Sequence, residues 1–116
     1  MTFLLLYFFD ARAWTSMTPS DKDSALQRLQ AWQQDQAHAE RVVHTGELRG
    51  IEETICVFLG PAGHTENPQV VPGPFLQGAA LGGYLVVQAG DQDEVIALVK
   101  SWPTGGVFEI RPILES

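Results

Sequence analysis

Two short runs of consecutive apolar residues constrain this sequence more than any other feature. Residues 3–9 read Phe-Leu-Leu-Leu-Tyr-Phe-Phe and residues 81–87 read Leu-Gly-Gly-Tyr-Leu-Val-Val. Both runs are short and rich in aromatic or branched residues, which favours strands over helices. Because successive side chains of a strand point to opposite sides, both faces of the resulting sheet are expected to be apolar. Such a sheet needs other parts of the protein, or a partner, packed against both of its faces.

Two helices are predicted from their end signals and from apolar spacing. Thr18 and Pro19 mark the start of the first helix, whose stripe of apolar positions continues to Val43 and predicts an end before Gly46. Asp91 caps the second helix and Pro103 stops it. These helices are expected to cover one face of the sheet.

The remaining strands are predicted at residues 54–59, 69–71 and 107–114, the two glycines of the second apolar run indicating a bulge. The resulting order predicts an α+β fold of the ferredoxin-like βαββαβ type with an antiparallel sheet. Two right-handed crossovers place both helices on the same face. The other face stays bare, and we expect a second copy to cover it in a homodimer, with higher oligomers left open. The alternative is cover by loops 10–20 and 60–80.

Composition narrows the class of protein. The 116 residues predict one domain spanning 1–116, and a net charge of -7 with a pI near 4.7 argues against nucleic acid or an anionic membrane as partner. Cys56 is the single cysteine, so neither a disulfide within the chain nor a cysteine-based zinc site is expected. The apolar run at residues 3–9 is too short for a signal segment or a membrane span. We therefore expect a cytoplasmic protein.

Several motifs appear in an order that resembles a known family. They are Gly-Pro-Phe at 73–75, Leu-Gly-Gly-Tyr at 81–84, the helix from Asp91, Glu-Ile-Arg-Pro at 109–112, a first strand ending in Asp10, and the stretch 42–48. Together they resemble the DGPF-type branch of the YCII-related family over nearly the whole chain. The resemblance implies a dimeric α/β barrel, in which two ferredoxin-like sheets pack face to face.

The same resemblance says less about activity. A few relatives are enzymes that use a His and an Asp in a cleft, and others are companions of sigma factors. Here Pro72 stands where the motif has Asp, and the position of the early helical His falls near Leu29. The His–Asp pair of those relatives therefore does not transfer to this chain.

Candidate catalytic residues are Asp10, at the end of the first strand, and His44, just past the first helix. A carboxylate beside a His could serve as orienter and general base. The alternative is a turn-forming Asp and a His that caps a helix end. His38 is expected in solvent beside Asp35, and Cys56 is expected to be a buried small hydrophobe. No metal site is predicted, His64 included, because the histidines lack ligand spacing.

Candidate ligand-binding residues are Trp14, Phe75, Tyr84 and Arg111. The three aromatic residues could wall an apolar pocket or belong to a dimer core. Arg111 could hold an anionic ligand or pair with Glu109 or with the partner chain.

Two functions remain open. The first is a small-molecule binding protein or cofactor-independent enzyme of proton-transfer or lyase-like chemistry, with a cleft between the first helix and the sheet. The second is a non-catalytic dimeric interaction module associated with a transcriptional regulator. A cavity holding Asp10 with His44 or Arg111 would favour the first.

Overall fold

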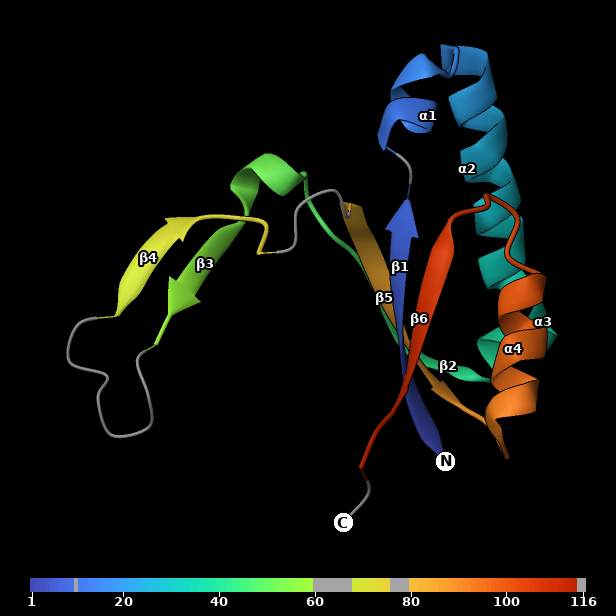
Figure 1. Ribbon diagram of the computed structural model, residues 1–116. Helices are drawn as coiled ribbons and strands as arrows, with labels where there is room; N and C mark the ends of the chain where they lie inside the picture. Colours follow the sequence, from blue (N-terminus) through green and yellow to red (C-terminus); the bar gives the residue numbers. More distant parts are fainter. Residues whose placement is uncertain (10, 60–67, 76–79, 115–116) are drawn as a thin grey trace.

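The computed structural model describes residues 1–9, 11–59, 68–75 and 80–114 (Figure 1). Its elements in chain order are β1 (Thr2–Phe9), α1 (Ala11–Ser16), α2 (Pro19–Gln34), α3 (Gln36–Ala39), β2 (Val42–Glu47), a 3-10 turn (Ile51–Glu53), β3 (Ile55–Phe58), β4 (Gln69–Pro72), β5 (Ala80–Gln88), α4 (Gln92–Lys100) and β6 (Val107–Pro112). Within the described residues, no helix combines the length and the apolar character that crossing a membrane requires.

Four strands form an antiparallel sheet in the order β2-β5-β1-β6. Helix α2 follows β1, helix α4 follows β5, and both lie against the same face of the sheet (Figure 1). This strand order and the one-sided helices are those of a ferredoxin-like fold. The predicted fold class is therefore confirmed.

The second strand of that sheet is not the predicted one. Residues 42–47 form β2, whereas the strand predicted at 54–59 becomes β3 and pairs only with β4. The predicted first helix ends early because Asp35 has extended backbone angles, φ -61° and ψ 124°, and its side chain accepts the Ala37 N–H at 2.9 Å. Asp35 thus ends α2 and caps the short α3. The adjacent β-branched Val42 and Val43 then favour a strand.

The core lies between the helices and the sheet. Phe3 and Leu5 on β1 are each 1% exposed. They pack in one cluster with Leu85 and Val87 of β5, Trp32 of α2, and Val95 and Leu98 of α4. The predicted caps support this layer, since Thr18 accepts the Asp21 N–H at 3.1 Å and Asp91 accepts the Glu94 N–H at 3.0 Å. The helix-covered face therefore carries the fold's main hydrophobic stabilisation.

The two glycines of β5 form the predicted bulge. Tyr7 pairs with Gly83, and the next residue, Phe8, pairs with Leu81, so Gly82 is the extra residue. A Cβ on Gly82 would lie 2.7 Å from the Phe9 ring. The bulge therefore depends on the missing side chain at this position.

Strands β3 and β4 form a separate two-stranded hairpin, here called the arm. It projects away from the four-stranded sheet, on the side opposite the helices (Figure 1). Gly73 donates its backbone N–H to the Thr54 oxygen at 2.9 Å and closes the base of the arm. Of the two segments proposed as alternative cover for the sheet, residues 11–16 form α1, and most of 60–80 is either arm or outside the described residues.

Candidate functional site

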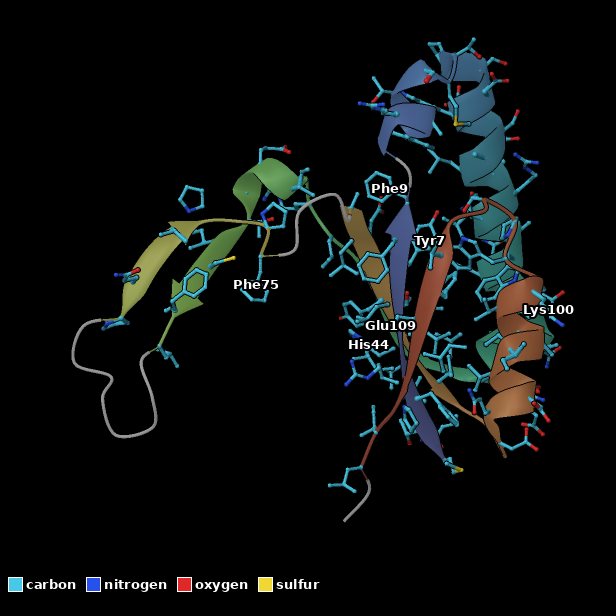
Figure 2. All side chains as sticks on the ribbon, in the orientation of Figure 1. Tyr7, Phe9, His44, Phe75, Lys100 and Glu109 are labelled. Carbon is cyan, nitrogen blue, oxygen red and sulfur yellow. The ribbon has the colours of Figure 1, made fainter. Side chains whose placement is uncertain are left out.

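The sheet face opposite the helices, here called the open face, collects several of the predicted site residues. Leu5 and Leu85 point into the helix-covered core, so their neighbours Leu4, Leu6 and Tyr84 point the other way. Figure 2 shows His44 and Glu109 on this side, away from the helices. The open face consists of Leu4, Leu6, Phe8, His44, Tyr84, Val86, Val107, Glu109 and Arg111.

The pairing register arranges these residues in two rows across the sheet. One row runs His44, Val86, Leu4, Arg111, and the next runs Gly46, Tyr84, Leu6, Glu109. Each row has polar or aromatic groups toward its ends and leucine or valine between them. Because neighbouring strands lie about 4.8 Å apart, the two ends of a row are separated by roughly 14 Å. The open face is thus an apolar strip with ionisable groups at both edges.

His44 and Tyr84 form the most specific polar contact on the open face. The Tyr84 hydroxyl lies 2.9 Å from His44 Nδ1, and the two rings stack with centroids 5.5 Å apart and planes 23° from parallel. Gly46 makes this packing possible, because a Cβ there would lie 2.5 Å from the Tyr84 ring. A phenol hydrogen-bonded to an imidazole can hold or pass a proton.

The other edge of the open face carries an ion pair. Arg111 Nη1 lies 3.6 Å from Glu109 Oε2, with side-chain exposures of 68% and 51%. The intrachain pairing considered for Arg111 is therefore observed. At such exposure the pair contributes at most about 1 kcal/mol. Arg111 can exchange Glu109 for an anionic ligand at little cost.

The other predicted site residues do not join this group. Asp10 lies outside the described residues, as does His64. Trp14 on α1 lies beneath Lys22, whose Nζ is 5.3 Å from the ring centroid. Phe75 packs on Phe58 of the arm with centroids 5.8 Å apart. The structure therefore brings together Tyr84 and His44, with Arg111 on the same face, and separates Trp14 and Phe75 from them.

The predicted location of the cleft needs correction. The space between helix and sheet is filled by core side chains such as Phe3, Leu5 and Trp32, and His44 lies on the opposite face, in a strand rather than at a helix end. A hollow of about 340 Å³ lies instead by the chain ends, lined by Met1 and residues 112–114. The candidate site is therefore the open face of the sheet and not a cleft between helix and sheet.

Sequence reasoning missed the role of His38. It was expected in solvent beside Asp35, but its ring stacks on Trp32 at 4.3 Å, its Nδ1 lies 2.8 Å from the Trp32 oxygen, and its Nε2 lies 3.3 Å from Ser101 Oγ. Trp32 Nε1 also donates to Ser101 Oγ, at 2.9 Å. These bonds tie α2, α3 and the end of α4 together, and the break at Asp35 turned His38 inward.

In the described parts of the chain, no three His, Cys, Asp or Glu side chains gather as metal ligands do. A shifted pKa is found on the other side of the sheet, at the carboxyl of Glu94. A hydrogen bond from the Gly90 N–H lowers the pKa of its carboxyl, and a hydrogen bond from Arg41 lowers it further. This carboxylate caps α4 and is remote from the open face.

The family model of the YCII-related domain matches residues 1–116. The chain belongs to the YCII-related family. This confirms the family that the motifs of the sequence resemble. None of the curated proteins matches the chain.

The structure of this YCII-related domain is similar to a solved structure, 5-chloro-2-hydroxyhydroquinone dehydrochlorinase (TftG) from Burkholderia phenoliruptrix AC1100 in complex with 2,5-dihydroxybenzoquinone. The TM-score is 0.57 at 13% sequence identity, and the match covers 100% of this chain and 96% of that chain. At this identity the likeness shows a shared fold.

Proposed function

We propose that this YCII-related domain binds a small planar molecule on its open face and carries out cofactor-independent proton transfer with the His44–Tyr84 pair. The single observation that carries the proposal is the 2.9 Å contact between Tyr84 Oη and His44 Nδ1. It stands beside the apolar strip formed by Leu4, Leu6 and Val86. An apolar wall with a few oriented polar groups is the usual composition of a small-molecule site.

The pair has the geometry for general base catalysis. In the tautomer with a proton on Nδ1, the Nδ1–H donates to the Tyr84 oxygen and Nε2 keeps a lone pair for the substrate. When Nε2 takes a proton, the same hydrogen bond to Tyr84 persists and supports the imidazolium. His44 is thus the proposed base and Tyr84 its positioning residue.

The substrate class is proposed from the open face and from the fold neighbour. Tyr84 offers a ring for stacking, and Arg111, at the other end of the apolar strip, offers a cation for an ionised hydroxyl or a carboxylate. TftG is named for a chlorinated hydroxyhydroquinone and holds a dihydroxybenzoquinone. A hydroxylated aromatic or quinone offers a flat ring to Tyr84 and an ionised oxygen to the Arg111 side chain, so we propose that class.

The active form is proposed to be a homodimer. Leu4, Leu6 and Phe8 stand half-buried on a face that the helices leave uncovered. Covering such side chains stabilises a protein by about 1.5–3 kcal/mol for each one fully buried. A second copy with the same face is the commonest way to supply this cover, and its sheet would turn the flat site into an enclosed one.

The test is ligand-induced stabilisation followed by chloride release. We expect 2,5-dihydroxybenzoquinone to raise the Tm of the wild type, since a ligand that binds only the native state stabilises it. The rise should shrink in Arg111→Gln and in Tyr84→Ala, which removes the ring, but not in Lys100→Gln, a basic residue on the helix side (Figure 2). With 5-chloro-2-hydroxyhydroquinone, His44→Gln should slow chloride release by about 100-fold or more, the usual size of a general base contribution.

A wild type whose Tm does not change with any hydroxylated aromatic, quinone or carboxylate would contradict the binding proposal. The second candidate, a non-catalytic interaction module, would then be preferred. A specific observation favours it as well, because the arm exposes apolar residues that lie outside the open face of their own chain.

A further inference from the structure

The arm exposes apolar side chains on both of its faces. One face carries Ile55, Val57 and Val70, which are 67%, 55% and 64% exposed. The other face, here called the Phe58 face, carries Cys56, Phe58 and Val71, with Phe75 packed on Phe58 and 71% exposed. Among the described residues, β3 and β4 pair only with each other, and most of the apolar side chains on both faces stay exposed.

A hairpin with this composition is poorly suited to water. Two strands without a third strand or a helix behind them are marginally stable. Exposed edge strands usually carry charged residues that prevent association, whereas β3 (Ile-Cys-Val-Phe) and β4 (Gln-Val-Val-Pro) contain none. The sequence of the arm is that of a strand pair which packs against another apolar surface.

The size of the exposed surface agrees with a large interface. The chain exposes 8533 Å², whereas a compact protein of its mass exposes about 6,200 Å². The excess of about 2,300 Å² exceeds the roughly 800 Å² per partner of an ordinary interface, which is enough for a dimer whose copies meet over a large area. The radius of gyration of 16.9 Å likewise exceeds the roughly 13 Å of a compact chain of this length.

A second copy supplies a matching surface. The open face is apolar in its centre, and both the open face and the arm lie on the side away from the helices (Figure 1). In a two-fold dimer every contact occurs twice, so an arm that reaches the partner is matched by the partner's arm reaching back. Phe75 lies on the side of the arm that is turned toward the chain's own sheet (Figure 2). A second copy seated on the open face would lie on this side of the arm, so it would meet the Phe58 face.

We propose that the arm of each copy lays its Phe58 face over the open face of a second copy, so that Phe58 and Phe75 wall the partner's His44–Tyr84 site. The proposal rests on the homodimer suggested above. It makes the site incomplete in a single chain, and it assigns a function to the two exposed phenylalanines.

The native chain offers a direct probe, because Cys56 is its only cysteine and lies on the Phe58 face. We expect its reaction with an aromatic disulfide reagent to slow at least ten-fold as the protein concentration rises through the monomer–dimer transition, followed by light scattering. Val107→Lys, at an exposed position of the open face (64%), should give a monomer whose Cys56 reacts quickly at every concentration.

Neighbouring residues of the same strand provide a matched pair. Phe58→Lys places a charge on the Phe58 face, and Val57→Lys places the same charge on the other face at a similarly exposed position, 55% against 45%. Phe58→Lys should restore fast Cys56 reaction and lower the wild-type ligand-induced rise in Tm, while Val57→Lys should behave as wild type. Circular dichroism establishes that both variants are folded.

The outcomes separate this proposal from the proposed function. A dimer whose Cys56 reacts at the monomer rate would overturn the arm contact but leave the homodimer and the site intact. A mass near 12.7 kDa at every concentration would overturn the second copy as occupant. Slow Cys56 reaction without any ligand-induced rise in Tm would support the arm contact and contradict ligand binding.

Discussion

The two faces of the sheet differ although the same strands build both. On β1, Leu5 is 1% exposed beneath the helices, while Leu4 and Leu6, its neighbours on either side, are half-buried on the open face. All three residues are leucine, so the difference in exposure comes from the helices, which pack on one face of the sheet and not on the other. The comparison shows that one face of the strand packs in the core of a single chain, whereas the other has no helix over it (Figure 1).

The polar residues follow the same division. On the helix side, His38 and Ser101 have their hydrogen bonds satisfied by Trp32 and Leu98, and they join helices to one another. On the open face, His44 has the Tyr84 hydroxyl at one ring nitrogen and remains exposed. A histidine with both nitrogens bonded within the fold supports structure, whereas an exposed one can meet a substrate.

The largest expected effect on stability comes from comparing two neighbouring leucines of β1, one on each face of the sheet. Leu5→Ala should lower the free energy of unfolding by about 2–5 kcal/mol, because it leaves a cavity in the helix-covered core. Leu6→Ala, the matched change on the open face, should cost less than about 1.5 kcal/mol in the dilute monomer. Urea denaturation at low protein concentration measures both. Equal losses would contradict the division of the sheet into a folding face and a free face.

The sequence predicted the folding face well because its signals are local. The run of consecutive apolar residues at 3–9 and the caps at Thr18 and Asp91 are each contained in a few neighbouring residues. The end of the first helix was misjudged because Asp35 breaks it from within a stripe that continues in apolar spacing to Val43. A capping Asp before Val-Val was the signal that could have revealed β2.

The candidate site was predicted only in part, because it depends on strand register. His44 and Tyr84 are 40 positions apart, and their contact follows from pairing Gly46 with Tyr84 across β2 and β5. Once β2 was read as helix, no local pattern could place His44 on the sheet. The arm illustrates the same limit, since residues 54–59 have the composition of a core strand yet pair outside the main sheet.

A second prediction tests the contact between His44 and Tyr84 without substituting either residue. In Gly46→Ala, the new Cβ would lie within 3 Å of the Tyr84 ring and should displace it from His44. We expect a loss of about 1–3 kcal/mol from overpacking, together with a ligand-induced rise in Tm as small as in Tyr84→Ala. Gly90→Ala is the control, because the nearest atom to its Cβ is 3.3 Å away on the flexible Glu94 side chain. Normal ligand binding by folded Gly46→Ala would argue against the pair.

The smallest expected effect is the change in Tm, and its dependence on pH, when Glu94 on the helix side of the sheet is substituted. Glu94 accepts the Gly90 N–H and the Arg41 guanidinium, each at 2.8 Å, and the first of these contacts contributes most to lowering its pKa in the folded protein. A carboxyl with a lowered folded-state pKa stabilises the protein fully above its ordinary pKa of 4.5, and this contribution is lost as the pH falls through the lowered value. Glu94→Gln should therefore lower the Tm slightly at pH 7.

The difference between the two proteins should narrow below pH 4.5 and vanish in stronger acid, where the wild-type carboxyl is protonated as well. Asp93→Asn removes the same charge from the same turn of α4 and is the matched control for the loss of a charge there. Ligand binding on the open face should be unchanged in both variants, because their effect is confined to the cap of a helix on the other side of the sheet. A Glu94→Gln protein that lost ligand binding would show that the two faces are coupled.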